Sequence, residues 1–414
     1  MKRIQTDLAV IGGGCAGMAG ALSAKKHGVR DVLIIERSPY LGGVLHQCIH
    51  NGFGVYQFHE DLTGTEFADQ YLRQVAAEAI AMMRQSLVLD ITADHTVTVM
   101  NREGMIEVEA KAILLATGCR ERPRGALLIP GSRPSGIFTA GTAQRYMNLE
   151  GFLVGRRIVI LGSGDIGLIM ARQFILEGAQ VLAVAEIQPY STGLTRNIVQ
   201  CLQDYDIPIY YNTTVTQIKG SKRLTGVTLA KTDERRNPIP GTERDIACDT
   251  LILSVGLIPE NELAYQAGIP LDPVTGGAIV DDRFQTAVPG IFAAGNALHV
   301  HDLADFVTAE SEEAGRHIAS YILQKPITEI AKVPVIGGPA VLGVVPQQIA
   351  AGAEGTVCLR FRPAGQYINC KTAVYSGETL IAQKRNPVVT PGEMCEIMID
   401  RSLVNGPVRV QVEP

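Results

Sequence analysis

Apolar runs that lead into clusters of glycine recur along the chain. Residues 8–11 are apolar and enter a glycine turn, a stretch of small residues follows, and a second apolar run, residues 32–35, ends on Glu36. Residues 157–186 repeat this order and end on Glu186. A strand, a Gly-x-Gly-x-x-Gly turn, a helix, a second strand and an acid predict a dinucleotide-binding α/β unit. The chain is therefore expected to contain two such units.

The two glycine turns also share their spacing. In both copies a glycine suited to ending the helix follows 11 residues after the last turn glycine (Gly17 to Gly28 in the first), and the acid follows 19 residues after it. Such a turn lets a pyrophosphate approach the backbone at a helix N-terminus, and the acid accepts hydrogen bonds from a ribose. The alternative, two chance turns in an ordinary α/β protein, is disfavoured by the matching intervals. The turn glycines are Gly12, Gly14 and Gly17 in the first copy and Gly162, Gly164 and Gly167 in the second.

The segment after the first unit mixes helical and strand periods. A capping-box signal at Thr63 and Glu66 precedes apolar residues at every fourth position, which predicts a helix to about Arg84. Short β-strands are expected over residues 86–110, and a strand over residues 112–115 then ends in Ala116, Thr117 and Gly118.

The second half of the chain follows the same order. A helical segment is expected near residues 195–204 and a β-meander over residues 209–247. A strand over residues 250–255 then closes on Gly256. The repeated order predicts two units of one architecture, each with a β-meander inserted into its parallel sheet.

A third glycine signal and a change of character mark the last part of the chain. In residues 286–296 a short apolar strand opens onto Gly295 and Asn296, and a helix is expected to begin between residues 302 and 308 and to end near Leu323. Alternating strand patterns over 356–361 and 408–412 then predict a small all-β module at residues 331–414. This module could be a docking surface for a partner protein, or a dimerisation or packing lid.

Composition narrows the class of protein. A share of 46% hydrophobic and 19% charged residues is ordinary for a globular chain, and the net charge of −5 gives no reason to expect nucleic acid or an anionic membrane surface. No apolar run reaches the roughly 18 residues that a transmembrane helix needs. The first strand begins within a few residues of the N-terminus, so no signal peptide is expected. Eight cysteines without regular spacing indicate reduced thiols. We expect a soluble, cytoplasmic protein.

These motifs carry a resemblance over residues 1 to about 325. Two nested dinucleotide units, a strand ending in ATG and a late GIFAAGN strand resemble the pyridine nucleotide-disulfide oxidoreductases of thioredoxin-reductase-like build. The resemblance implies an α/β fold with two nested Rossmann-like domains, to which the strand patterns add the small C-terminal all-β module. It implies an FAD-binding domain of residues 1–118 and 258–330, and an NAD(P)-binding domain of residues 119–257.

The resemblance also assigns residues to the two cofactors. It implies FAD contacts at Gly12, Gly14, Cys15, Ala16, Gly17, Glu36, Arg37, Gly42, Gly43, Ala116, Thr117, Gly118, Gly295 and Asn296. It implies nicotinamide-dinucleotide contacts at Gly162, Gly164, Asp165, Ile166, Gly167, Glu186 and Gly256. The family usually has Asp at the position of Asn296, and a neutral amide can still form a hydrogen bond near the ribityl chain.

The acid of the second unit favours one nicotinamide cofactor over the other. A carboxylate at Glu186 accepts a hydrogen bond from a ribose 2′-hydroxyl and repels a 2′-phosphate. No arginine occurs in residues 187–190 to bind such a phosphate. The sequence therefore favours NAD.

The cysteines argue against the disulfide chemistry for which the family is named. No two of the eight form a CxxC or CxxxxC pair, so a disulfide reductase of the usual kind is not expected. Cys48 lies alone in a loop with His46 and His50. It could be a redox thiol that His46 or His50 activates, or a small buried residue that lines the flavin pocket.

Two histidines follow the late strand and precede the last helix. His299 and His301 could donate protons or anchor substrate beside the flavin. They could also be a metal pair, but two ligands without a nearby third are weak evidence for a metal site. The alternative is a hydrogen-bonded turn that caps the helix.

A closer resemblance concerns the electron partner. The stretch ATGCRER resembles flavin subunits of multi-component dehydrogenases of opine and sarcosine oxidation and of hydrogen cyanide synthase. The stretches LGGVLHQCIHNGFG, CDTLILSVGLIPENEL and GNALHVHD resemble a bacterial group associated with a glycerol-3-phosphate-dehydrogenase-like flavoprotein and a small cysteine-rich protein. This resemblance implies an oligomeric oxidoreductase that passes hydride between NAD(H) and FAD and exchanges electrons with a partner flavoprotein. The partner would act on a small metabolite, with glycerol 3-phosphate as one candidate. The alternatives are a stand-alone NADH oxidase or peroxidase that uses Cys48, and a non-catalytic flavin-binding subunit.

Overall fold

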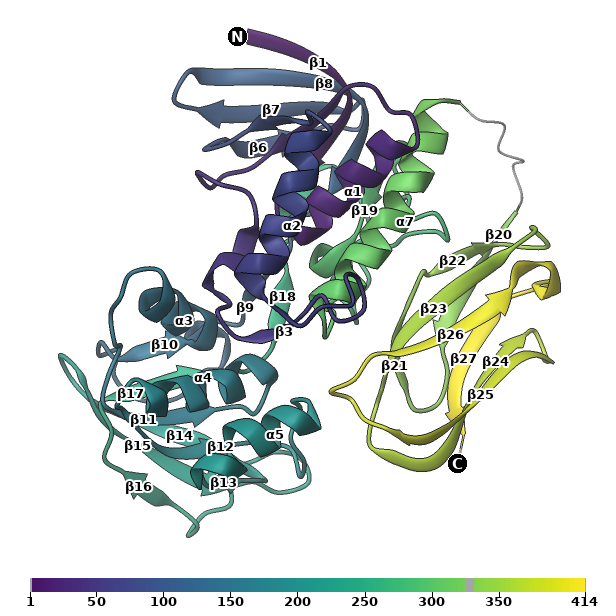
Figure 1. The fold of residues 1–414 in the computed structure, drawn as a ribbon. Coiled ribbons are helices and arrows are strands. Elements are labelled where there is room, and N and C mark those ends of the chain that lie inside the picture. The colour runs from purple at the N-terminus through teal and green to yellow at the C-terminus, as the bar shows by residue number, and fades with distance from the viewer. Residues whose placement is uncertain (1, 325–330, 414) are drawn as a thin grey trace. The chain divides into compact units, whose positions relative to one another are not determined.

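The computed structural model describes residues 2–324 and 331–413 and divides the chain into two compact units (Figure 1). The first unit consists of Met1–Cys119 and Pro259–Pro414, and the second consists of Arg120–Ile258. The C-terminal strands belong to the first unit by their contacts. The expected border at residue 330 falls at the end of a segment, 325–330, that lies outside the described residues.

A seven-stranded sheet forms the centre of the first unit. Its strand order is β5-β2-β1-β8-β7-β6, and β19 pairs with β8. The pairs β5–β2, β2–β1, β1–β8 and β8–β19 are parallel, and β8–β7 and β7–β6 are antiparallel. Strand β2 is buried on both faces, as its unbroken apolar sequence predicts for a parallel strand. The strands are β1 (Lys2–Ile11), β2 (Val32–Ile35), β5 (Ala81–Met83), β6 (Leu87–Ile91), β7 (Thr96–Asn101), β8 (Gly104–Leu115) and β19 (Ile291–Ala293).

Helices α1 (Cys15–Lys26) and α7 (Ala304–Ile322) pack against this sheet, and α2 (Gly64–Ala77) packs against α1. Figure 1 shows α1 and α7 side by side. Small residues permit this approach, since a Cβ on Gly315 of α7 would lie 2.4 Å from the carbonyl oxygen of Gly20 of α1. The small-residue character of the first helix in the sequence is therefore a packing requirement.

Helix α2 begins as predicted and ends earlier than predicted. The capping box is present, with Thr63 and Glu66 each accepting a hydrogen bond from the backbone of the other. The helix ends at Ala77, so its predicted extension to Arg84 is wrong. Ala79 takes a left-handed conformation (φ 50°), and β5 then pairs with β2. Pairing at the sheet edge outweighs the helical propensity of these residues.

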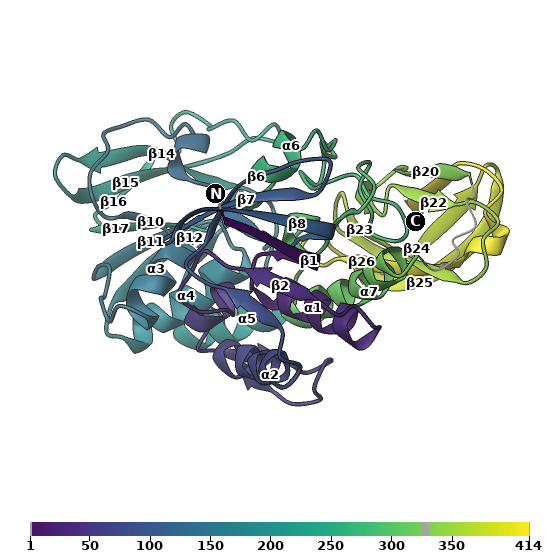
Figure 2. The same cartoon turned by 90° about the horizontal axis from the view of Figure 1, so that it is seen from above.

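The second unit is a three-layer arrangement. Its parallel sheet has the order β10-β17-β11-β12-β13, and Figure 2 shows the helices on one face and a three-stranded antiparallel sheet on the other. Alternation along β11 explains the layers, because Ile158 and Ile160 pack with the helices whereas Val159 and Leu161 pack with the small sheet. The elements are β10 (Ile137–Thr139), α3 (Ala140–Asn148), β11 (Arg157–Leu161), α4 (Asp165–Leu176), β12 (Gln180–Ala185), α5 (Thr195–Cys201), β13 (Ile209–Tyr210), β14 (Thr213–Gly220), β15 (Leu224–Lys231), β16 (Arg244–Ile246) and β17 (Thr250–Leu253).

The C-terminal strands form two sheets around a common apolar core, which we call the C-terminal sandwich. One sheet has the order β22-β20-β27-β24-β25 and the other β21-β23-β26. Inward residues from both sheets share one core, among them Val374 and Val410 of the first and Leu359 and Ile397 of the second. The strands are β20 (Lys332–Gly337), β21 (Val341–Val345), β22 (Gln348–Ala350), β23 (Thr356–Pro363), β24 (Tyr367–Ser376), β25 (Thr379–Val389), β26 (Cys395–Asp400) and β27 (Val408–Glu413).

The structure confirms the predicted fold class, with a Rossmann-type α/β sheet and a β-meander in each unit and an all-β C-terminal part. None of the helices among the described residues combines the length and the apolar character needed to cross a bilayer.

Candidate functional site

Strand register brings the distant motifs of the first unit to one edge of its sheet. Ile11 is in register with both Ile35 and Leu115, and Leu115 is in register with Ala293. The carboxyl ends of four parallel strands therefore coincide. The residues that follow these strands are the first glycine turn, Glu36, the Ala116–Thr117–Gly118 segment and the Gly295–Asn296 turn.

The first glycine turn has free space at one glycine and none at the other two. A Cβ would lie 2.4 Å from the Ala116 carbonyl oxygen if placed on Gly12, and 1.9 Å from the Gly12 carbonyl oxygen if placed on Gly17. A Cβ on Gly14 would meet nothing within 4 Å. Gly14 is the N-cap of α1, where unpaired backbone N–H groups and the helix dipole favour a phosphate. The turn thus fits a dinucleotide pyrophosphate.

The acid of the first unit supports the turn from within. Glu36 is buried, and its Oε2 accepts a hydrogen bond from the Gly13 N–H at 2.8 Å, while Oε1 accepts one from the Ser38 N–H at 2.7 Å. A carboxylate retains further lone pairs for a ligand hydroxyl. The next residue, Arg37, is exposed.

Other expected residues of this edge hold its loops together. A Cβ on Gly43 would lie 3.2 Å from the Gly14 Cα, so the loop that begins at Gly42 and Gly43 lies against the glycine turn. On the opposite side, the Ala116 N–H donates to the Ile11 carbonyl at 3.0 Å and the Thr117 hydroxyl donates to the Glu260 carbonyl at 2.7 Å. The Gly118 carbonyl accepts from the Glu260 N–H at 3.0 Å. Cys15 and Ala16 form the first turn of α1.

Asn296 connects two neighbouring segments of the chain. Its Oδ1 accepts a hydrogen bond from the His301 N–H at 3.0 Å, and its Nδ2 lies 3.6 Å from the Cys119 sulfur. The amide therefore positions the segment that follows the late strand. One Nδ2 hydrogen can serve that contact while the other remains for a ligand.

Both late histidines contact a buried carboxylate that the sequence interpretation missed. His299 Nε2 lies 2.7 Å and His301 Nε2 3.4 Å from Glu310 Oε2. Glu310 Oε1 accepts a hydrogen bond from the Gly295 N–H at 2.9 Å. Arg360 of the C-terminal sandwich completes the group, with Nη1 3.4 Å from Glu310 Oε2. We call His299, His301, Glu310 and Arg360 the buried charge cluster.

The electrostatics of this cluster follow from its burial. Burial lowers the pKa of His299, an effect that the neighbouring Glu310 partly opposes. Burial alone would raise the pKa of Glu310, but His299 and His301 hold it well below its ordinary value. Burial also works to lower the pKa of Arg360, and Glu310 raises it above the usual range. The carboxylate is therefore ionised, and the guanidinium compensates its charge.

The cluster also bears on two earlier interpretations. Side-chain atoms of His299, His301 and Glu310 that could bind a metal lie within 4.8 Å of one another. Glu310 would be the third ligand that the sequence did not reveal. Arg360 already occupies the neighbourhood of the shared oxygen with a positive charge, which favours an ion-pair network over a metal site. The segment that carries both histidines is a hydrogen-bonded turn, as the alternative interpretation held, since the His299 N–H donates to the Gly295 carbonyl at 3.1 Å. The capping part of that interpretation is wrong, because the N-cap of α7 is Leu303 and no side chain caps it.

The loop around Cys48 packs against the start of α2. The Cys48 carbonyl accepts a hydrogen bond from the Gly64 N–H at 2.9 Å. His46 Nε2 contacts the Leu41 carbonyl, and His50 Nδ1 lies 3.0 Å from the Asn51 carbonyl oxygen. Burial raises the pKa of Cys48 to about 12, and nearby Cys15 adds to the shift. A thiol that remains protonated is a weak nucleophile, which favours the packing role of Cys48.

The second unit repeats the edge with its own residues. Leu161 is in register with Ala185 and Leu253, so the second glycine turn and Glu186 emerge together. Glu186 is buried and accepts hydrogen bonds from the Ser163 N–H at 2.9 Å, the Ser163 hydroxyl at 2.6 Å and the Gln188 N–H at 2.8 Å. Ser163 is a residue that the sequence interpretation did not select.

The second glycine turn is less crowded at its middle glycine than at the other two, although it is tighter there than the first turn. A Cβ on Gly164 would lie 3.3 Å from the Ser254 hydroxyl oxygen, whereas one on Gly162 would lie 2.0 Å from the Ser254 carbonyl oxygen and one on Gly167 2.6 Å from the Ser254 Cβ. Asp165 Oδ1 accepts from the Leu194 N–H at 2.8 Å and so holds the start of α5.

The two remaining expected residues of the second unit have internal roles. Ile166 packs against the helical core, and the Gly256 carbonyl accepts from the Arg122 N–H at 3.0 Å.

Two further acids position loops at these edges. Asp305, in the first turn of α7, accepts hydrogen bonds from the N–H groups of Gly54, Tyr56 and Gln57 at 2.9–3.0 Å. Glu121 accepts from the Gly141 N–H at 2.7 Å at the start of α3. For Glu310 a signal was available, because it lies three residues after Val307 and four before Ala314, a spacing that places it on the buried face of α7.

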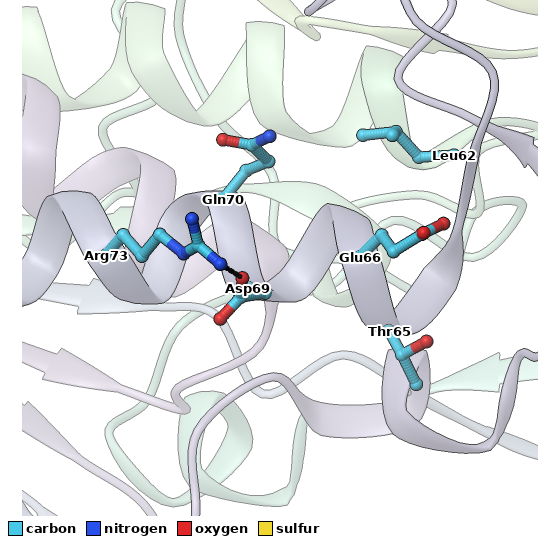
Figure 3. Close-up of a pocket in the computed structure, with 6 residues that line it drawn as sticks. All are labelled: Leu62, Thr65, Glu66, Asp69, Gln70 and Arg73. Atoms are coloured by element: carbon cyan, nitrogen blue, oxygen red, sulfur yellow. Dashed lines mark ion pairs between the residues drawn. The ribbon is translucent and has the colours of Figure 1, made fainter.

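A surface pocket beside α2 is a separate feature (Figure 3). Asp69 and Arg73 form an ion pair at 2.6 Å at i, i+4 spacing, and Glu66 belongs to the capping box. None of the glycine-turn residues lines it, and its polar groups serve the helix. Its lining residues are Leu62, Thr65, Glu66, Asp69, Gln70 and Arg73.

Comparisons with known proteins agree with this geometry. The family model described as pyridine nucleotide-disulphide oxidoreductase matches residues 6–314. The hydrogen cyanide synthase subunit HcnB of Pseudomonas aeruginosa is 27% identical over 340 residues, which cover 76% of this chain and 70% of HcnB. An opine oxidase subunit of Agrobacterium tumefaciens is 26% identical over 340 residues, which cover 76% of this chain and 64% of that relative.

A solved structure shows the same fold. The crystal structure of thioredoxin reductase from T. acidophilum superposes with a TM-score of 0.64 at 24% identity, over 76% of this chain and 98% of that one. Proteins of the matched family bind FAD and use a nicotinamide dinucleotide. The chain belongs to the pyridine nucleotide-disulfide oxidoreductase family.

Proposed function

We propose that the chain is an FAD-dependent NAD(H) oxidoreductase whose first unit holds FAD and whose second unit holds NAD(H). The observation that carries the proposal is the pair of matching edges. In each unit a buried carboxylate braces the glycine turn, and the middle glycine is the least crowded of the three, with open space at Gly14 and a nearest contact of 3.3 Å at Gly164. Space reserved at the N-terminus of a helix indicates a phosphate-bearing ligand in both units.

Each edge supplies the groups that a dinucleotide needs. The N–H groups at the start of α1 and α4 would bind pyrophosphate, and Glu36 and Glu186 would accept hydrogen bonds from ribose. Bound FAD would supply reversible two-electron chemistry with the nicotinamide. Glu186 favours NAD over NADP because its carboxylate repels a 2′-phosphate.

Electrons would be exchanged with a partner flavoprotein that oxidises a small metabolite. Two relatives, HcnB and the opine oxidase protein, are named as subunits, which supports a multi-subunit enzyme. The chain lacks a CxxC or CxxxxC pair. The raised pKa of Cys48 disfavours a stand-alone peroxidase that depends on its thiolate. From the sequence resemblance we propose glycerol 3-phosphate as the substrate of the partner flavoprotein and a small cysteine-rich protein as a second partner.

An anaerobic titration tests the proposal. Purified protein loaded with FAD should lose its visible flavin absorption on addition of about one equivalent of NADH, and NADPH in a parallel titration should bleach it far less. A protein that holds FAD and is not bleached by NADH would contradict direct hydride transfer. Admitting oxygen or peroxide then tests the alternative, since rapid turnover that Cys48→Ser abolishes would favour the stand-alone oxidase.

A further inference from the structure

The segment His299–Asp302 ends against the C-terminal sandwich. Two arginines on one strand of the sandwich, β23, reach this segment and the carboxylate beneath it. We propose that Arg360 and Arg362 are positioning residues that hold the loop at the carboxyl end of β19, so that the sandwich forms part of the flavin site. This proposal rests on the proposed FAD-binding function of the first unit.

Arg362 holds the end of the segment directly. Its Nη2 donates to the Val300 carbonyl at 3.0 Å and also contacts the Asp302 carboxylate. The other oxygen of that carboxylate accepts from the Met394 N–H at 2.6 Å. Both oxygens of Asp302 are therefore bound by the sandwich, immediately before α7 begins.

Arg360 reaches the glycine turn through one intermediate. Its Nη1 lies 3.4 Å from Glu310 Oε2, and the other oxygen of Glu310 accepts from the Gly295 N–H at 2.9 Å. Arg360 is itself fixed by Glu396, whose Oε1 accepts from Nε at 2.8 Å. One carboxylate thus connects the sandwich with the first glycine after β19.

The charge of Glu310 makes its contact with Arg360 necessary. The Glu310 side chain is fully buried, and an ionised carboxylate in such a place requires a compensating cation. Both histidines that touch it lie in the same segment, so a change in Glu310 would be felt at His299 and His301. Removal of Arg360 should therefore loosen or repack the segment as well as the interface.

A third arginine provides a matched control. Arg401 Nη1 contacts Asp282 Oδ2 at 2.8 Å, so it also binds the sandwich to the rest of the first unit. Asp282 lies in the turn before β19 and belongs to neither the His299–Asp302 segment nor the buried charge cluster. Arg401→Gln should weaken docking without altering the loop.

The experiment compares full-length Arg360→Gln, Arg362→Gln and Arg401→Gln with the parent chain, and adds Arg360→Lys. The first readout is hydrogen–deuterium exchange of residues 295–303 in the protein freed of FAD. The second is the midpoint potential of bound flavin. For Arg360→Gln and Arg362→Gln we expect exchange in this segment to be faster by a factor of roughly ten or more. We also expect a shifted midpoint potential of the bound flavin. Arg401→Gln should leave both unchanged, and Arg360→Lys should restore part of the parent behaviour.

Each outcome decides for or against the proposal. Equal effects of all three glutamine variants would reduce the arginines to docking contacts, and no effect of the first two would contradict the proposal. One equivalent of zinc in the purified parent protein that Glu310→Gln loses would show a metal site instead. If the parent chain binds no FAD, the proposed function fails, while the exchange experiment still measures whether the arginines position the segment.

Discussion

Alanine at the middle glycine of either turn should separate the two cofactor sites. Gly14 has φ −73° and ψ −172°, and Gly164 has φ −66° and ψ 157°, conformations that alanine adopts without strain. A Cβ on Gly14 would meet nothing within 4 Å, and one on Gly164 would meet only Ser254, at 3.3 Å. Gly14→Ala should weaken FAD binding alone, and Gly164→Ala should weaken NADH binding alone.

The expected loss of affinity follows from filling the space that the pyrophosphate would occupy. The new methyl group would overpack the contact with a pyrophosphate, which costs about 1–3 kcal/mol, or roughly 5- to 140-fold in affinity. Folding should change little. Reduced chain entropy in the unfolded state stabilises by about 0.4–1 kcal/mol, and alanine is a poorer N-cap than glycine by a similar amount. The melting temperature of the FAD-free protein should therefore stay close to that of the parent.

The assay combines thermal melting without FAD, FAD binding followed by flavin fluorescence, and NADH binding to the FAD-loaded protein. Each variant serves as the control for the other. Gly17→Ala provides the contrast for fold damage, since its Cβ would lie 1.9 Å from the Gly12 carbonyl oxygen. If Gly14→Ala bound FAD as tightly as the parent, or lost NADH affinity instead, the assignment of the first edge to FAD would be refuted.

Three further predictions concern single side chains. Glu186→Gln should weaken NADH binding by about 1.5–3 kcal/mol and narrow the preference for NADH over NADPH, because a charged hydrogen-bond acceptor is lost. Titrations with both nucleotides measure this, and an unchanged ratio of the two affinities would contradict it. Cys48→Ser should keep FAD and NADH bleaching, and Cys48 should resist iodoacetamide at about pH 8 because burial raises its pKa to about 12; mass spectrometry of rapid labelling checks the second point. Burial, and then Arg316, lower the pKa of His317 to about 3, so the folded protein keeps this ring neutral while the unfolded chain takes up a proton below about pH 6.5. The free energy of unfolding should therefore decrease as the pH is lowered below about 6.5, by up to about 2 kcal/mol at about pH 5. Partial exposure of the ring reduces this figure in proportion. Urea unfolding of His317→Asn should show a shallower pH dependence than the parent protein.

The sequence was most informative where a structural requirement is local. The order of strand, glycine turn, helix, strand and acid predicted both parallel units, because a close helix–strand contact excludes a Cβ at Gly17 and Gly167 whatever else the chain does. The end of α2 was predicted wrongly, because pairing of β5 with β2 is a tertiary effect. The contact of Asn296 with the His301 backbone was not predicted, since it depends on a turn that no local pattern encodes.

The buried charge cluster marks the other limit of sequence interpretation. His299 and His301 were selected, and Glu310, eleven residues after His299, was missed although its spacing favours the buried face of α7. Arg360 lies 50 residues beyond Glu310, on a strand of another layer. Only the fold brings these groups together, so their pairing could not have been inferred from spacing.

The buried charge cluster extends beyond the part of the chain that the family model matches. The family match ends at residue 314, after Glu310 and before Arg360 and Arg362. Burying the Glu310 carboxylate without a compensating cation would be costly. The matched part of this chain therefore depends on Arg360, which lies outside the matched range. The same β23 strand binds the segment that carries both late histidines. The C-terminal sandwich is thus held to the rest of the first unit by charged residues that lie outside the matched range.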